Sequence, residues 1–321
     1  MHRRGLVVAF AVLAVLASCS MPAPNPGPAS SSSGPGTALT TPSIGVPSQP
    51  QPPPPMPELP RGGFSLFPEF RLFGYSGYPG APGQGRLGIG TLEERLREIE
   101  SRGRRWVGGR ALLPVMELIA VTVHASAGRD GKYRSRTSDA IISTWLKAAR
   151  KHRALLLLNI QPGRADFLDE VKYFEKWLVD PHVGLALDPE WAVGAGQVPG
   201  RVFGSTSGAE LNGVGEWVAE LVKRHNLPEK VVLYHQLHLN IVKNEKRLRP
   251  QPGVVWIKSI DGIGSPGAKV STYNRVSAAT PAFVHGGFKL FYLEDVATGR
   301  RLMTPKEVLA LRPQPEYILF E

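Results

Sequence analysis

Residues 154–191 read ALLLLNIQPGRADFLDEVKYFEKWLVDPHVGLALDPEW, two apolar runs separated by one amphipathic segment. The runs at 154–160 and 183–187 predict buried strands, because they are short, continuous and apolar. Residues 165–179 carry their apolar side chains at helical spacing, which predicts a helix between the two strands. A strand, a helix and a strand in this order are typical of a parallel sheet covered by helices on both faces.

The same alternation extends over residues 64–321. The predicted strands are 70–77, 112–123, 154–160, 183–187, 201–204, 230–235, 253–260 and 288–293, with a short apolar tail at 316–320 that either extends the sheet or packs on it. The predicted helices are 91–104, 138–152, 165–179, 208–225, 268–279 and 305–311. Eight strands that alternate with helical or connecting segments over this length predict a (β/α)8 barrel. A doubly wound open sheet is the alternative, and it lacks its Gly-rich phosphate loop here.

The first 60 residues have a different composition. They hold 14 of the 30 prolines, and no Lys or Arg lies between Arg4 and Arg61. No aromatic residue lies between Phe10 and Phe64. Such a segment cannot bury a core, and its prolines favour extended chain. We therefore expect residues 19–63 to be a Pro/Ser/Gly-rich linker, and residues 64–321 to be the barrel domain.

The extreme N-terminus predicts export. Arg3 and Arg4 precede an apolar run at 6–16, which is shorter than the roughly 20 residues that span a membrane and is typical of a secretory signal. The sequence Leu-Ala-Ser-Cys at 16–19 follows, with the single cysteine of the chain. It resembles a bacterial lipobox, which implies cleavage after residue 18 and a lipid on Cys19. The expected location is the outer face of the cell membrane; ordinary and twin-arginine export both remain open.

Composition and charge exclude several classes of protein. One cysteine excludes a disulfide scaffold, a Cys-rich zinc site and an iron–sulfur cluster. The net charge is +11, of which +10 belongs to residues 61–321. On an exported domain this charge favours a glycan or anionic envelope polymer as partner over nucleic acid. We expect a monomer that uses no cofactor.

The polar residues of the predicted barrel concentrate at the ends of its strands, where barrel enzymes carry their chemistry. Asp188 and Glu190 form the sharpest pair, because residues i and i+2 of a strand face the same side. Two close carboxylates raise one pKa, so that one group stays protonated at neutral pH. Glycosidic cleavage needs such a proton donor and a second carboxylate. The alternative is a turn in which Asp188 caps backbone amides and Glu190 is solvated.

Further candidates lie on other predicted strands. Glu117 and Asp261 are candidate bases or nucleophiles, with a paired core acid and a turn aspartate as the respective alternatives. Candidate substrate-binding residues are Trp191, Gln161, Gln236, Tyr75, His124, Tyr234 and Arg134, with structural packing as the alternative for several of them. Arg134 belongs to the basic loop at 128–136, which we expect at the barrel mouth, binding an anionic substituent or shaping a lid.

A metal site is not expected. His235 and His238 are three residues apart, hence on opposite faces of a strand, and no HExxH motif is present. We expect them to be ordinary hydrogen-bonded histidines. A site made of Glu117, His124, Asp188 and Glu190, as in barrel phosphodiesterases, is the alternative that stays open.

Two resemblances bear on function. The Asp-x-Glu at 188–190 after the fourth strand resembles the motif of chitinase-like and Chalaropsis-type lysozyme barrels, which implies Glu190 as proton donor and Asp188 as its partner. The segments NIQPGRADFLDEV at 159–171 and VGLALDPEW at 183–191 resemble uncharacterised lipoproteins of high-GC Gram-positive bacteria. The favoured expectation is an envelope-anchored glycoside hydrolase. A non-catalytic glycan-binding lipoprotein and a metal-dependent phosphodiesterase are the alternatives.

Overall fold

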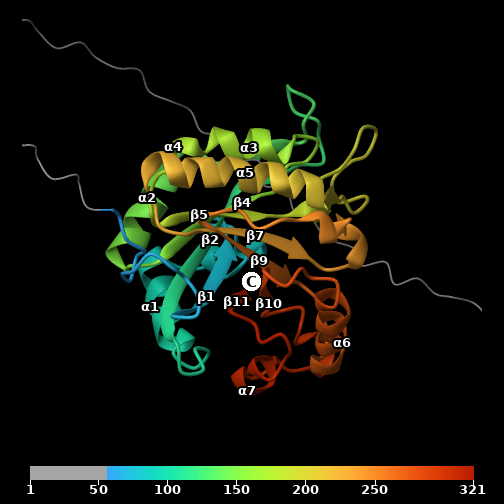
Figure 1. The fold of residues 1–321 in the computed structure, drawn as a ribbon. Coiled ribbons are helices and arrows are strands. Elements are labelled where there is room, and N and C mark those ends of the chain that lie inside the picture. Colours follow the sequence, from blue (N-terminus) through green and yellow to red (C-terminus); the bar gives the residue numbers. More distant parts are fainter. Residues whose placement is uncertain (1–55) are drawn as a thin grey trace, which may run out of the picture. The chain divides into compact units, whose positions relative to one another are not determined.

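Eight parallel strands close into a barrel in this computed structural model, which describes residues 56–321 (Figure 1). Their order is β1, β11, β10, β9, β7, β5, β4 and β2, and β1 pairs with β2 to complete the circle. The barrel strands are β1 Phe70–Gly77, β2 Ala111–Val123, β4 Leu155–Ile160, β5 Val183–Leu187, β7 Lys230–Gln236, β9 Val254–Ile260, β10 His285–Leu290 and β11 Tyr317–Phe320. The predicted (β/α)8 barrel is therefore confirmed.

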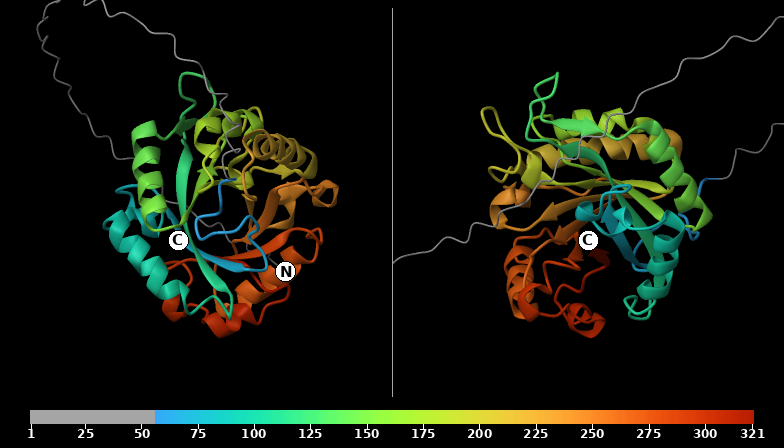
Figure 2. Two further views of the ribbon diagram at one scale, coloured as in Figure 1. Left: turned by 60° about the vertical axis from the view of Figure 1, so that its left-hand side comes forward. Right: turned by 180° about the vertical axis from the view of Figure 1, so that it is seen from behind.

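Helices surround the barrel within the same residues (Figure 2). The α-helices are α1 Leu92–Gly103, α2 Asp139–Lys151, α3 Phe167–Tyr173, α4 Glu175–Leu178, α5 Gly208–His225, α6 Pro266–Ser277 and α7 Pro305–Leu309. The short 3-10 helices are η1 Pro82–Gln84, η2 Arg86–Gly88, η3 Pro189–Trp191, η4 Leu239–Ile241, η5 Glu245–Arg247 and η6 Ala297–Gly299. The β7–β9 connection carries only η4, η5 and the short strand β8.

Three short strands lie outside the ring. β3 Arg134–Arg136 pairs antiparallel with the end of β2. β6 Thr206–Ser207 pairs in parallel with β8 Val242–Lys243. All three belong to connections that leave the carboxyl ends of barrel strands, so they help to order the loops around the mouth.

One predicted strand is absent and another has shifted bounds, whereas the tail at 316–320 extends the sheet, one of the two outcomes left open. Residues 201–204 form no barrel strand, since Val202 makes only an isolated bridge with Pro199. The eighth strand is β11, which pairs with both β1 and β10 and is buried along its whole length. A four-residue strand gives too short a pattern to distinguish from a packed tail. The strand predicted at 288–293 begins earlier, at His285.

Alternate residues of each strand face the barrel interior and the helices. The interior is filled by a mostly aliphatic cluster that includes Leu72, Leu113, Leu157 and Leu233. The intervening residues pack in a second cluster with side chains of the helices. Because the strands are covered on both faces, their sequences are continuous apolar runs.

A segment before β1 closes the N-terminal end of the barrel, and it is blue in Figure 2. Leu59 and Leu66 are buried in the interior cluster. The backbone N–H of Leu66 donates to Glu229 Oε2 over 2.7 Å, next to the start of β7. Residues 56–63, which the sequence analysis assigned to the linker, therefore belong to the compact unit that begins at Met56. This end of the interior is sealed by apolar side chains.

Among residues 56–321, no helix has the length and apolar character that a membrane crossing requires. The predicted signal at 1–18, Cys19 and the linker up to residue 55 lie outside the described residues. Export and lipidation therefore stay predictions from the sequence.

Candidate active site

Polar side chains gather at the carboxyl ends of the barrel strands. They are Ser76 on β1, Glu117 on β2, Asn159 on β4, Asp188 after β5, His235 on β7, Ser259 and Asp261 on and after β9, Lys289 on β10 and Glu321 after β11. Asn159 and His235 lie two positions beyond the interior residues Leu157 and Leu233, hence on the same side of their strands. The same inward face is thus apolar at one end of the barrel and polar at the other.

His235 joins three of the four predicted carboxylates. It is fully buried, and its Nδ1 donates to Asp261 Oδ2 over 2.7 Å. Its Nε2 donates to Glu117 Oε1 over 2.8 Å, and Asp188 Oδ1 lies 3.6 Å from the same nitrogen. Because β2 and β7 are not neighbours in the barrel, the His235–Glu117 contact crosses the interior.

The pKa values of the residues in this cluster are shifted by the charges of their neighbours. Burial acts to lower the pKa of His235, but the carboxylates of Asp261, Glu117 and Asp188 raise it well above its ordinary value. Burial acts to raise the pKa of Asp261, but His235 and Lys289 lower it to about 2. The pKa of Glu117 is likewise lowered by His235 against the effect of burial. We infer an imidazolium between ionised carboxylates.

Glu117 uses both of its carboxylate oxygens within the protein. Besides His235, Asn159 Nδ2 donates to its Oε1 over 3.0 Å, and the Tyr317 hydroxyl donates to its Oε2 over 3.1 Å. Glu117 is fully buried. A carboxylate with this many donors and no exposure is placed to hold His235, not to reach a substrate.

Lys289 supports the other side of the cluster. Its Nζ lies 2.6 Å from Glu321 Oε2 and 3.5 Å from Asp261 Oδ2. The Ser76 hydroxyl donates to the same Glu321 oxygen over 3.2 Å, and the Ser259 hydroxyl donates to Asp261 Oδ1 over 2.7 Å. Burial acts to lower the pKa of Lys289, but Glu321 and Asp261 raise it well above its ordinary value. Asp261 is therefore engaged on both oxygens.

Asp188 is less completely paired. Gln161 Nε2 donates to its Oδ2 over a long 3.4 Å, while Gln161 Oε1 accepts from the backbone N–H of Val123 over 3.2 Å. Burial raises the pKa of Asp188, against the opposing charges of His235 and Lys289. Asp188 thus lies between the fully paired cluster and the loop that follows β5.

Glu190 differs from every other acid of the site. β5 ends at Leu187, so Glu190 lies on the turn η3 and the strand argument that paired it with Asp188 does not hold for the backbone. The two side chains nevertheless interact. Burial and then the charge of Asp188 raise the pKa of Glu190 to about 8. Its Oε2 is buried without a hydrogen-bond partner among residues 56–321. A pKa of about 8 favours the protonated form of Glu190 at neutral pH, and its Oε2 is left without a hydrogen bond within residues 56–321.

Exposure separates the acids further. Glu117 is 0% exposed and Asp188 and Asp261 are each 6% exposed, whereas Glu190 is partly exposed. Glu190 is therefore the most accessible of the four acids, and Glu117 the least.

Two predicted substrate-binding tyrosines face away from the mouth. Tyr75 is fully buried in the cluster between barrel and helices, and its hydroxyl accepts from Tyr292 over 3.3 Å. The Tyr234 hydroxyl donates to Glu245 Oε1 over 2.6 Å, in a network that also holds Lys258. Because inward and outward positions alternate, residues next to inward His235 and Ser76 face the helices.

His124 and Arg134 have other partners. His124 is exposed, and its Nε2 shares a 2.6 Å hydrogen bond with Ser135 Oγ. Arg134 is neutralised by Glu170 at 2.8 Å and Asp130 at 2.6 Å. His124 therefore does not join the buried carboxylates, and in the described part of the chain no three His, Cys, Asp or Glu side chains are placed to hold a metal ion.

The remaining two candidates lie around the mouth. Gln236 is buried at the end of β7, where its Nε2 donates to the His238 carbonyl over 3.1 Å and its Oε1 has no partner within residues 56–321. Trp191 ends η3 and is partly exposed beside Glu190. Gln236 and Trp191 therefore both lie around the mouth of the barrel.

Sequence analysis did not assign a functional role to His235, Lys289 or Tyr317. Each lies on a barrel strand, and the polar residues of a buried strand are the signal that singled out Glu117. His235 was expected to be an ordinary hydrogen-bonded histidine. Which acids would surround it depends on contacts across the barrel, between residues more than 100 positions apart in the case of Glu117.

Comparisons with known proteins add little. No protein-family model matches the chain, and no curated protein matches its sequence. Among solved structures, a family GH18 chitinase from Chromobacterium violaceum is similar at 11% identity over 79% of each chain, with a TM-score of 0.40. A likeness of this extent carries no argument about activity.

Proposed function

We propose that the barrel domain is a glycoside hydrolase in which Glu190 is the proton donor. The observation that carries this proposal is its buried, unpartnered Oε2 together with a pKa of about 8. A general acid works best when its pKa lies near the working pH. Structural acids in the same site, such as Glu117, are ionised and use their oxygens in internal hydrogen bonds.

Glu190 donates its proton to the glycosidic oxygen as the bond to the anomeric carbon breaks. Positive charge then develops on the sugar ring, and a carboxylate beside the ring stabilises it. Asp188 is the acid next to Glu190; burial raises its pKa, and the positive charges of His235 and Lys289 oppose that shift and favour the carboxylate. Water then adds to the anomeric carbon and releases its proton to a carboxylate of the site, and that proton replaces the one that Glu190 gave up.

A glycan-binding protein without catalysis is the competing interpretation. Binding requires matched polar groups and apolar surface but no acid that stays protonated at pH 7. The decisive test incubates the full chain with a panel of purified envelope polysaccharides, neutral and anionic, and measures new reducing ends. If the wild-type protein releases none while binding one of them, the enzyme proposal is wrong.

Replacing the proposed acid gives the sharper result. Glu190→Gln keeps the shape and removes the proton donor, so turnover falls by about 10²–10⁴-fold while glycan binding is retained. Glu216→Gln is the matched control, because Glu216 is exposed on α5, with 62% of its side chain accessible. Equal activity of the two variants would remove Glu190 from the mechanism.

The proposal also includes an anchor. Signal cleavage after residue 18 and a lipid on Cys19 would hold the domain at the outer face of the cell membrane, on a proline-rich linker. Feeding producing cells an alkyne-labelled palmitate tests this directly. The wild-type chain takes up label and partitions with membranes, and Cys19→Ser loses both. Label on the Cys19→Ser chain would contradict lipidation at this residue.

A further inference from the structure

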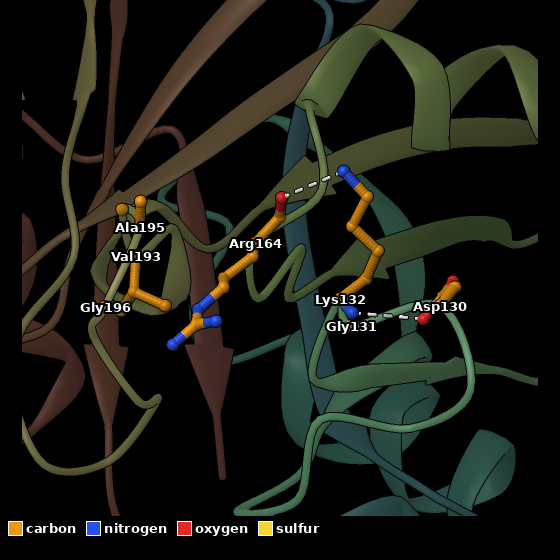
Figure 3. A pocket seen from close by; sticks show the side chains of 8 residues that line it. Asp130, Gly131, Lys132, Arg164, Val193, Ala195 and Gly196 are labelled. Atoms are coloured by element: carbon orange, nitrogen blue, oxygen red, sulfur yellow. Dashed lines mark hydrogen bonds between the residues drawn. The ribbon is translucent and has the colours of Figure 1, made fainter.

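Three loops at the mouth line an open cavity (Figure 3). Its volume is about 340 Å³, within the range of small-ligand sites. Asp130 and Lys132 line it from the loop after β2, Arg164 from the loop after β4, and residues 193–196 from the loop after β5. Residue 193 is only three positions beyond Glu190.

Backbone hydrogen bonds hold these loops against one another. The N–H of Arg164 donates to the Lys132 carbonyl over 2.8 Å, and the N–H of Val193 donates to the Gly163 carbonyl over 2.9 Å. Gly163 has φ +62°, and a Cβ there would lie 2.3 Å from the Lys132 oxygen. Only glycine allows this close approach. The cavity is therefore a built part of the mouth.

Among residues 56–321, no acid forms an ion pair with Arg164 or Lys132, the two cations of the cavity. Arg164 Nε donates to the Gln197 carbonyl over 2.8 Å, and its guanidinium lies 4.2 Å from the centre of the Tyr133 ring. Lys132 Nζ donates only to the Arg164 carbonyl, at 3.5 Å. Within residues 56–321 neither side chain forms an ion pair. Figure 3 shows the guanidinium pointing toward the 193–196 loop.

The nearby acid is already engaged. Asp130 Oδ1 accepts from the backbone N–H of Lys132 over 3.1 Å, and Asp130 Oδ2 pairs with Arg134 at 2.6 Å. Arg134 and Arg136 both pair with buried Glu170. Arg134 and Arg136 are thus paired with acids, whereas within residues 56–321 Arg164 and Lys132 form no ion pair.

We propose that this cavity is a subsite for an anionic group on the glycan, a sugar carboxylate or a phosphate ester. Arg164 presents the planar fork that carboxylates and phosphates match, and Lys132 adds a second charge. Glu190 lies on η3, and the chain reaches the cavity lining at Val193, so we infer that a sugar held here lies near the one being cleaved. This inference rests on the proposed glycoside hydrolase function and narrows its substrate to acidic or phosphorylated glycans.

Direct binding tests the subsite without turnover. The full chain carrying Glu190→Gln is titrated calorimetrically at low salt with an oligogalacturonide, with its fully methyl-esterified and therefore neutral form, and with a glycerol-phosphate oligomer. The first and third probes separate a carboxylate from a phosphate preference. Binding of at least one anionic probe, several-fold tighter than the ester and weakened by salt, supports the subsite.

Variants locate the binding. Arg164→Gln weakens the preferred anionic probe about tenfold or more, since it removes charged hydrogen bonds, and leaves the ester unchanged. Lys132→Gln gives a smaller loss in the same direction. Arg164→Lys keeps the positive charge but removes the planar guanidinium. It therefore tests the contribution of that planar group even if Arg164→Gln does not fold. Arg129→Gln is the matched control, because Arg129 is exposed in the same loop and does not line the cavity.

Three results would each overturn the subsite. The first is an equal loss of affinity for the anionic probe in Arg164→Gln and Arg129→Gln. The others are equal affinity for the acidic and esterified probes, and no binding of either anionic probe. Because Glu190 is already replaced in these titrations, the outcome is independent of catalysis. Conversely, turnover of a neutral glycan by the wild-type protein, with no anionic binding, would support the hydrolase and remove the subsite.

Discussion

The two ends of the barrel interior use alternate positions of the same strands, yet they hold opposite kinds of side chain. Leu157 and Leu233 fill the N-terminal half, which Leu59 and Leu66 seal. Two positions further along, Asn159 and His235 belong to a buried network of charges. The first end stabilises the barrel by burial of apolar surface; the second removes charges from water and compensates them with ion pairs. Such a costly arrangement is expected where chemistry takes place.

Within the polar end, a second difference separates Glu190 from the other acids. Glu117 and Asp261 are ionised and engaged on both oxygens, whereas Glu190 is protonated and has a buried oxygen without a partner. The following predictions separate these regions by stability, by pH dependence and by activity.

The largest effect is expected at His235. His235→Ala leaves Glu117, Asp188 and Asp261 buried without their shared cation, which lowers the free energy of unfolding by about 3–5 kcal/mol at pH 7. Leu157→Ala at the apolar end is the comparison, with a cost of about 2–5 kcal/mol from a cavity. Urea denaturation measures both.

The pH dependence of the unfolding free energy distinguishes the loss of stability in His235→Ala from the loss in Leu157→Ala. The low pKa of Asp261, about 2, means that it contributes stability above its unfolded pKa, which is lost as the pH falls toward 2. Without His235 the acids protonate more readily, so the His235→Ala deficit shrinks between pH 7 and pH 4. The Leu157→Ala deficit stays constant. Two parallel profiles would mean that no buried charge cluster exists.

The next largest effect is on the pH dependence of stability at Glu190, and its direction is opposite to that at Asp261. Its folded pKa of about 8 lies above its unfolded value, so the stability it contributes is present at low pH and is lost as the pH rises toward 8. Glu190→Gln avoids this loss. The variant therefore becomes more stable than the wild type above pH 8, by an amount on the order of a few kcal/mol, and differs little from it at pH 4. A variant less stable at pH 9 would show an ionised, well-paired Glu190.

The smallest effect is expected at Tyr75, outside the barrel interior. Tyr75→Phe removes one hydroxyl that bonds to Tyr292 and costs about 1 kcal/mol of unfolding free energy. Its kcat/KM stays within twofold of the wild type, because the ring faces the helices. A large loss of kcat/KM with unchanged stability would return Tyr75 to the substrate site.

Much of the fold follows from sequence pattern alone. Apolar runs such as 155–158 and 231–233 are long enough to mark strands covered on both faces, and the barrel follows from their number and order. β11 was not clearly predicted as a strand, because its four residues give too little periodicity. Its place in the barrel depends on pairing with β1, which lies far away in the sequence, and with β10, which precedes it across a long connection.

The site was predictable in part. Asp188, Glu190, Glu117 and Asp261 lie close together as expected, yet for a different reason at Glu190, which lies on η3 and not on an extended strand. The role of His235 was not predictable, since nothing local shows which acids face it across the barrel. The same limit applies to Arg134, whose charge is taken up by Glu170 on α3.

The central claim is that Glu190 is protonated at neutral pH while Glu117 and Asp261 are not. Carbon-13 NMR of the side-chain carboxyls, with the full chain labelled at Glu and titrated from pH 4 to pH 10, measures this directly. The Glu190→Gln spectrum assigns the signal. The account predicts one glutamate carboxyl with a midpoint near pH 8 that is absent from the variant. A Glu190 midpoint between pH 4 and 5 would contradict it.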